Sequence, residues 1–197
     1  MKTGAVITAA GLSSRMGSFK PLLKIGNFTA IEHIILGFRF AGIKNIVIVT
    51  GNKAEELESS LKSLDLVFLK NDMYEHNEMF DSVRIGLNFL KDLCDKIFIS
   101  PVDAPLFAPD TVKALLHCKA NVGIPVYQGK SGHPIILDNE AACKILEYKG
   151  ADGLRGAVAN LSLTIERIET GDRGVLYDMN TQADYAGIIQ LYEKKNQ

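Results

Sequence analysis

The sequence predicts an α/β protein in which a three-layer, doubly wound and mostly parallel sheet carries helices on both faces. Short apolar segments alternate with longer amphipathic ones over the first 120 residues, as in parallel sheets connected by helices. Segments that are apolar at every position, such as 47–49, suit strands buried on both sides. A length of 197 residues suffices for one continuous core, so we expect a single domain over 1–197.

The first 120 residues predict four strands and four helices in alternation. The expected strands cover 4–9, 45–50, 66–69 and 96–100. Apolar residues at helical spacing predict helices over 29–41, 53–64, 80–93 and 109–118. Gly42 is a stop signal after the first helix, and Pro109 suits the first turn of the last one.

The alternation of strands and helices is less regular after residue 120. Two strands, 122–126 and 134–137, are expected on either side of a Gly-rich turn at 128–132. A further strand is expected at 161–168, and a closing helix at 181–194.

The composition and the first apolar run limit which kinds of binding partner and which cellular location we expect. Lys and Arg number 22 against 23 Asp and Glu, whereas a surface for a long polyanion usually carries a basic excess. We therefore expect neither nucleic acid nor a membrane as a partner. Cys94, Cys118 and Cys143 form no C-x-x-C pair, which suits a reducing cytosol. The first apolar run is too short for a signal-peptide core, so a cytoplasmic protein is expected.

The loop after the first strand is the first candidate site, because ligands of such sheets bind beyond the carboxyl ends of the strands. Ala9, Ala10 and Gly11 are small enough for phosphate oxygens to approach the backbone N–H groups. Arg15 and Lys20 add two cations for a triphosphate. The spacing from Gly11 to Gly17 fits neither G-x-x-x-x-G-K-[ST] nor G-x-G-x-x-G. A turn with exposed cations remains the alternative.

Asp103 is the second candidate, between Pro101 and Pro105 directly after the fourth expected strand. A carboxylate at this end of a strand faces the ligand side, and Mg²⁺ prefers one or two carboxylates with phosphate oxygens and water. A turn-forming Asp is the alternative.

A family resemblance connects these segments. Residues 9–23, Ala-Ala-Gly-Leu-Ser-Ser-Arg-Met-Gly-Ser-Phe-Lys-Pro-Leu-Leu, resemble the signature loop of the MobA-like nucleotidyltransferases. The Ala-Ala-Gly opening is closer to the molybdenum cofactor cytidylyltransferase branch than to the guanylyl branch. The resemblance covers nearly the whole chain in the right order. It implies a Rossmann-like nucleotidyltransferase fold, with a nucleotide-binding half at 1–120 and an acceptor-binding half at 121–197.

The resemblance also implies roles for single residues. Arg15, Lys20 and Asp103 would be catalytic. The nucleotide would contact the residues of the first loop and of a segment near 80, namely Ala9, Ala10, Gly11, Leu12, Ser13, Asn77, Met79 and Ser82. Mg²⁺ would be held by Asp103 and by the segment 178–185, where Asn180 stands in place of the family's second Asp, so Asp178 is the alternative ligand. For Thr181 and Asp184 we expect helix capping.

The acceptor side is implied by two weaker matches. Gly132-His133-Pro134 resembles a Gly-His-Pro segment that faces the acceptor, and Arg155 lies in a segment that resembles Gly-Asp-x-Gly-Ala-Arg. A surface salt bridge is the alternative for Arg155. The implied partners are a nucleoside triphosphate (CTP or GTP), a phosphorylated small-molecule acceptor and, transiently, a molybdoenzyme.

The resulting hypothesis is a Mg²⁺-dependent transfer of CMP from CTP to molybdopterin, with release of pyrophosphate. Two alternatives stay open. One is a sugar- or alcohol-phosphate nucleotidyltransferase. The other is a non-catalytic nucleotide-binding or chaperone module, which the uncharged Asn180 keeps possible. A dehydrogenase-type dinucleotide module is disfavoured by the glycine spacing of the first loop.

Overall fold

A mixed eight-stranded sheet forms the centre of the molecule in the computed structural model, which describes residues 1–12, 16–76 and 78–195. Seven strands lie in the order β10-β7-β9-β6-β1-β4-β5, and β8 pairs with β7. The strands are β1 (Thr3–Ala9), β4 (Asn45–Thr50), β5 (Val67–Lys70), β6 (Lys96–Pro101), β7 (Val122–Tyr127), β8 (Lys130–Ser131), β9 (Ile135–Asp138) and β10 (Ile165–Glu169).

Most neighbouring strands are parallel, as predicted. Strand β1 pairs in parallel with both β4 and β6, while β9 lies antiparallel between β6 and β7. The parallel pairs bring the carboxyl ends of β1, β4 and β6 to one edge of the sheet.

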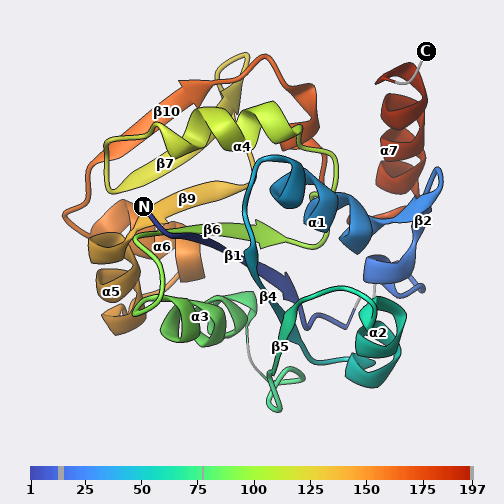
Figure 1. Cartoon of the computed structure of the whole chain (residues 1–197), viewed down its shortest axis with the longest axis horizontal. Helices are drawn as coiled ribbons and strands as arrows, with labels where there is room; N and C mark the ends of the chain where they lie inside the picture. The colour runs from blue at the N-terminus through green and yellow to red at the C-terminus, as the bar shows by residue number, and fades with distance from the viewer. Residues whose placement is uncertain (13–15, 77, 196–197) are drawn as a thin grey trace.

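Helices cover both faces of the sheet (Figure 1). They are α1 (Ala30–Phe40), α2 (Ala54–Leu61), α3 (Met79–Leu90), α4 (Pro109–Leu116), α5 (Asn139–Glu147), α6 (Gly153–Asn160) and α7 (Gln182–Lys195). One core contains side chains of α1, α2 and α4, and the other contains side chains of α3, α5 and α6. Strand β1 contributes side chains to both cores, because successive residues of a strand point to opposite faces. Ala5 and Ile7 lie in the first core, and Val6 lies in the second.

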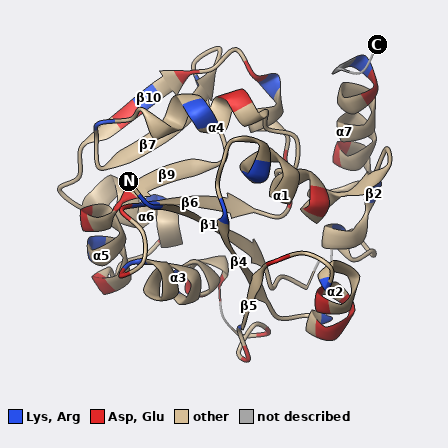
Figure 2. Ribbon diagram, viewed as in Figure 1, with Lys and Arg blue, Asp and Glu red and all other residues tan. Residues whose placement is uncertain are grey.

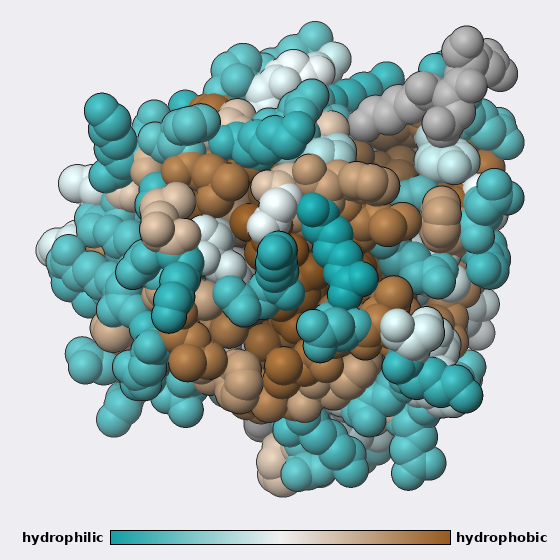
Figure 3. Space-filling model, viewed as in Figure 1, coloured by the Kyte–Doolittle hydropathy of each residue, from teal (hydrophilic) through white to brown (hydrophobic). Residues whose placement is uncertain are grey.

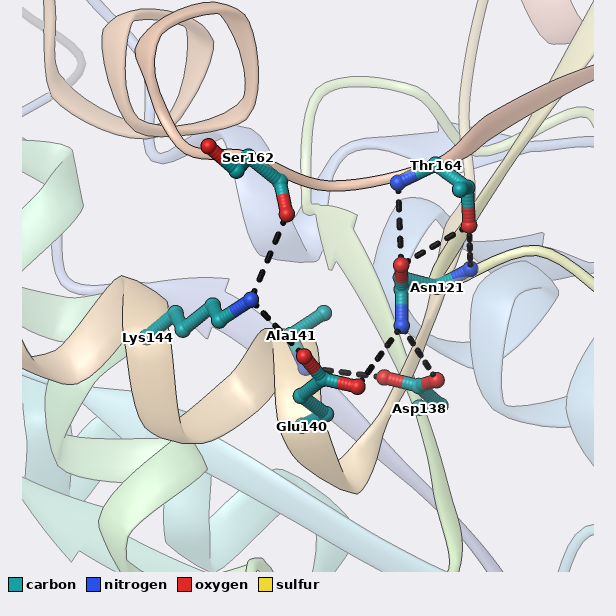
Figure 4. A network of polar contacts seen from close by, with 7 residues as sticks. All are labelled: Asn121, Asp138, Glu140, Ala141, Lys144, Ser162 and Thr164. Carbon is teal, nitrogen blue, oxygen red and sulfur yellow. Dashed lines mark hydrogen bonds and ion pairs between the residues drawn. The ribbon is translucent and has the colours of Figure 1, made fainter.

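Two helices, α5 and α6, were not expected from the sequence, and β10 begins at Ile165 rather than at 161. Helix α5 begins where Asp138 accepts a hydrogen bond from the Ala141 N–H at 2.8 Å, as an N-cap. The other Asp138 oxygen accepts one from the Asn121 amide at 2.9 Å. Asn121 also bonds to the backbone and hydroxyl of Thr164 (Figure 4). This network ties α5 to the strands beside it.

A third, smaller apolar cluster holds α7 against a hairpin of β2 (Lys24–Ile25) and β3 (Phe28–Thr29). The hairpin turns at Gly26, which has a φ of +60°. A Cβ on Gly26 would lie 2.4 Å from the Tyr192 ring of α7, so the glycine is needed both for the turn and for the packing. Two short 3₁₀ helices, η1 (Lys20–Leu22) and η2 (Arg173–Leu176), complete the fold.

The surface mixes the two signs of charge. Figure 2 shows basic and acidic residues interspersed over the helices, and Figure 3 shows apolar side chains gathered in the middle of the same face within a hydrophilic surround. In the described ranges no helix combines the length and the apolar character needed to cross a bilayer.

Candidate active site

A cleft that is open to solvent lies beyond the carboxyl ends of β1 and β6. Three of the loops selected from the sequence meet in it, and the lining residues are Thr8, Ala9, Ala10, Gly11, Lys20, Pro21, Asn71, Tyr74, Glu78, Met79, Ser82, Pro101, Val102 and Asp103.

The loop after β1 passes close to the loop after β4. The carbonyl of Ala10 accepts a hydrogen bond from the Asn52 N–H at 3.2 Å. A Cβ on Gly51 would lie 2.8 Å from the Ala10 Cβ, so only glycine allows this approach. Leu12 is half exposed. The expected contacts Ser13 and Arg15 lie outside the described residues.

Lys20 is a cation that lines the cleft. Its Nζ lies 3.0 Å from Asn180 Oδ1 and 3.7 Å from Asp103 Oδ2, and its side chain is largely buried. The Met179 N–H donates to the Asp103 carbonyl at 2.8 Å, which fixes the C-terminal segment beside the loop after β6. Three residues separated widely in the sequence thus form one charged cluster.

Asp178 lies next to this cluster but lines a neighbouring hollow with Tyr177 and Asp184. The carboxylate is accessible to solvent, yet the protein around it removes part of its hydration. This partial desolvation, together with the negative charge of Asp103, raises the pKa of Asp178 to about 6, although Lys20 opposes the shift.

The following residues begin α7. The N–H groups of Asn180 and Thr181 donate to Asp184 Oδ2 at 3.1 and 2.7 Å, and the Thr181 hydroxyl accepts from the Asp184 N–H at 3.2 Å. This is the capping expected for Thr181 and Asp184. It fixes the backbone from which Asn180 reaches Lys20.

The other end of the cleft is polar and partly buried. Ser82 and Met79, both at the start of α3, line it, while Asn77 falls outside the described residues. Asn71, Tyr74 and Glu78 also line it and were not singled out from the sequence. The signal that could have found Asn71 is its position directly after β5, at the same edge of the sheet as Asp103.

His133 and Arg155 occupy different environments. His133 follows β8, its N–H donates to the Val175 carbonyl at 3.0 Å, and its Nδ1 is buried without a hydrogen-bond partner among the described residues. Burial lowers the pKa of His133, and the negative charge of Asp103 partly opposes this. Arg155 is exposed on α6, is not among the lining residues and forms no ion pair with any described residue.

The oxygen atoms around Lys20 fit a Mg²⁺ ion that binds together with phosphates. In the described part of the chain, no group of three or more His, Cys, Asp or Glu side chains is arranged to hold a metal. A Mg²⁺ on a nucleotide needs only one or two protein oxygens, since phosphates and water supply the rest. Asp103 and Asn180 offer a carboxylate and an amide oxygen that already face a cation.

Comparisons with known proteins agree with this geometry. The chain is 25% identical over 193 residues to the molybdenum cofactor cytidylyltransferase of Escherichia coli, covering 95% of each protein. It is 26% identical over 174 residues to the bifunctional protein GlmU of Staphylococcus haemolyticus. That match covers 82% of this chain and 38% of the length of GlmU.

Solved structures show the same fold. A nucleotidyl transferase from Methanothermobacter thermautotroptrophicus superimposes with a TM-score of 0.84 at 22% identity, covering 98% of this chain and 99% of that one. The manganese complex of Rv0371c from Mycobacterium tuberculosis superimposes with a TM-score of 0.77 at 20% identity, covering 96% and 99%. These likenesses confirm the α/β nucleotidyltransferase fold.

The family itself follows from a match over most of the chain. The model of the MobA-like NTP transferase domain matches residues 5–165, which include the first loop, the segment around Ser82 and Asp103. The chain therefore belongs to the MobA-like NTP transferase family, as its sequence motifs predicted.

Proposed function

We propose that the protein is a cytoplasmic, Mg²⁺-dependent nucleotidyltransferase that transfers CMP from CTP to molybdopterin and releases pyrophosphate. The observation that carries the proposal is the position of the Lys20 ammonium between Asn180 Oδ1 and Asp103 Oδ2, beside the small-residue loop Ala9–Gly11. A cation, a carboxylate and accessible backbone in one cleft are the groups that a triphosphate with a divalent ion requires.

In the proposed reaction, a phosphate oxygen of the acceptor attacks the α-phosphorus of the nucleotide. The new P–O bond forms as the bond from the α-phosphorus to the oxygen bridging the β-phosphate breaks, and that oxygen leaves with pyrophosphate. A phosphate monoester is already a nucleophile, so the protein's task is positioning and charge neutralisation. Lys20, with Arg15, would neutralise the triphosphate and the departing pyrophosphate.

Asp103 and Asn180 would hold the metal ion, with Asp178 as the alternative to Asn180. The bound ion would neutralise phosphate charge and align the reacting groups. The manganese complex of a structural relative supports a divalent metal in this fold.

The residues beyond 120 would provide the acceptor side. His133, whose Nδ1 is buried without a hydrogen-bond partner among the described residues, would hydrogen-bond the acceptor, and Arg155, exposed on α6, would bind the acceptor phosphate. The choice of CTP and molybdopterin is supported by the full-length similarity to the E. coli molybdenum cofactor cytidylyltransferase. A molybdoenzyme that receives the product is the protein partner that this proposal implies.

The test is the release of pyrophosphate from CTP in the presence of purified molybdopterin and Mg²⁺. Asp103→Asn preserves shape but removes the charge, so turnover should fall by about 10²–10³-fold, the usual cost of losing one electrostatic group of an active site. The melting temperature should stay close to that of the wild type.

Asp110→Asn is the matched control, because Asp110 makes its ion pair with Lys113 on the exposed first turn of α4. It should retain full turnover. Full turnover by Asp103→Asn would contradict the proposal. GTP and ATP as donors, and a sugar phosphate as acceptor, test the competing substrates in the same assay. Nucleotide binding without turnover on any acceptor would favour a non-catalytic module.

A further inference from the structure

The beginning of α7 reaches back across the fold to the first loop. Gln182 is the first residue of α7, and its side-chain amide donates a hydrogen bond to the Met16 carbonyl at 2.9 Å. Since a carbonyl oxygen can only accept, the amide atom that faces it must be the nitrogen. The two residues are 166 positions apart in the sequence, so the bond is a purely tertiary contact.

The rest of the turn at 179–182 holds the same stretch of the first loop. The Met179 side chain is fully buried and lies with Met16 in the third apolar cluster. The Asn180 Oδ1 lies 3.0 Å from the Lys20 Nζ. One short turn of the chain therefore holds the first loop at two points, one at Met16 and one at Lys20.

Between these two points the first loop turns at Gly17, which has a φ of +63°. A glycine backbone is conformationally permissive, and a Cβ on Gly17 would meet no described atom within 4 Å. Packing around Gly17 therefore does not fix the turn, and the place of Lys20 depends in part on what holds the loop beside it. Asn180 holds the ammonium group itself, whereas Gln182 holds the backbone that leads to it.

We propose that Gln182 is a positioning residue, which sets where the Lys20 ammonium meets the triphosphate by holding the Met16 backbone. The inference rests on the proposed function, in which Lys20 neutralises the triphosphate. Gln182 is not among the residues that line the cleft, so it acts through Lys20 and not by contact with the nucleotide. The affinity for a triphosphate thereby depends on how the start of α7 is docked.

The substitution Gln182→Met tests this role, because methionine is about as long as glutamine but has no hydrogen to donate. Without the bond, the Met16 backbone is released and Lys20 meets the phosphates in a less favourable position. We expect the Kd for CTP with Mg²⁺ to rise by about 5–10-fold, less than the loss of a whole charge-assisted hydrogen bond. The Kd for CMP, which lacks the β- and γ-phosphates, should stay nearly unchanged.

Stability is measured on the same protein. The melting temperature of Gln182→Met should fall by no more than about 2–4 °C, the shift for one ordinary hydrogen bond in a protein of this size. Gln190→Met is the matched control, since Gln190 is exposed on the same helix and its side chain has no hydrogen-bond partner among the described residues. It should keep the wild-type affinity for CTP.

A double-mutant cycle shows whether Gln182 acts through Lys20. Isothermal titration calorimetry with CTP and Mg²⁺, without acceptor, compares the wild type, Gln182→Met, Lys20→Met and the protein with both substitutions. If the role of Gln182 is to place the ammonium group, its removal costs nothing once that group is gone. In the Lys20→Met background, Gln182→Met should therefore cause no further loss of affinity for CTP.

The outcomes separate the two proposals. If wild-type protein binds no CTP, the proposed function fails, and this inference fails with it. If it binds CTP, the inference alone is overturned by an unchanged Kd for CTP in Gln182→Met, by an equal loss for CTP and CMP, or by a further loss in the Lys20→Met background. A Gln182→Met protein that does not fold would also overturn it, because the bond would then serve the fold and not the place of Lys20.

Discussion

Lys20 contacts two residues that are distant from it in the sequence. Asn180 lies 160 positions further along the chain, and Asp103 lies more than 80 positions further along. A largely buried ammonium needs such partners, because an unpaired charge loses its hydration without compensation. A bound triphosphate would offer Lys20 stronger acceptors than an amide oxygen. Asn180 and Asp103, which contact Lys20, are thus the residues proposed to hold the metal ion beside the phosphates.

Gly11 gives a test at the same scale. Its φ is not in the left-handed region, and a Cβ there would meet no described atom within 4 Å. The fold should therefore tolerate Gly11→Ala, with an unfolding free energy within about 0.5 kcal/mol of the wild type. A methyl group would nevertheless obstruct phosphate approach to the loop backbone, so the affinity for CTP should fall by about 10-fold.

Calorimetry with CTP and thermal unfolding would check both halves of this prediction on one sample. Wild-type affinity for CTP in Gly11→Ala would show that the phosphates do not approach this part of the loop. A large loss of stability would show instead that the glycine serves the fold.

Helix α3 determines where one wall of the cleft lies. It carries Met79 and Ser82 at its start and packs on β1, where a Cβ on Gly86 would lie 2.3 Å from Val6 Cγ1. The absence of a side chain therefore sets the distance between helix and sheet. Any residue larger than glycine must move the helix or strain the sheet.

We therefore predict that Gly86→Ala destabilises the protein by about 1–3 kcal/mol, the usual cost of overpacking a core. It should also weaken CTP binding, because Ser82 moves with the helix. Chemical denaturation and calorimetry measure the two effects. Gly187→Ala in α7 is the matched control, since its Cβ would make only an ordinary contact, 3.8 Å from Tyr177. Helix propensity alone would make Gly86→Ala and Gly187→Ala equally stabilising. Such a result would contradict the close packing of α3 on β1.

The elements that the sequence did not predict are those with weak local signals. Helix α6 contains Gly153 and Gly156, which lower helix propensity, and a Cβ on Gly156 would lie 2.0 Å from the Ala151 carbonyl oxygen. Helix α5 offers only a short apolar stripe of Ala141, Ala142 and Ile145. Both helices become stable by packing with α3 in one core, and such contacts are not visible in local periodicity.

The charged cluster also affects the stability of the whole molecule. The pKa of Asp178 is raised from 3.8 to about 6 in the folded protein, so the folded state binds a proton more tightly than the unfolded state between these pH values. The folded state consequently loses stability as the pH rises from about 4 through 6. At neutral pH the ionised Asp178 is destabilising.

Asp178→Asn should therefore stabilise the protein at pH 7.5 relative to the wild type, and less so at pH 4.5. We expect the pH-dependent part to be below about 1 kcal/mol, because the carboxylate is accessible to solvent and its interactions are screened. Thermal or urea unfolding of both proteins at the two pH values measures it, with Asp110→Asn as the matched substitution. A stability difference that does not change with pH would contradict a raised pKa of Asp178.

The sequence by itself determined the alternation of strands and helices, the family, and the positions of Lys20 and Asp103 as candidates. These features are local, because periodicity and loop motifs are written in consecutive residues. The tertiary structure decided which distant residues meet. It placed Asn180 against Lys20, left Arg155 outside the cleft, and brought the Asn71 amide within hydrogen-bond distance of the Ser82 hydroxyl. Such contacts depend on strand order and helix packing, and no local pattern encodes them.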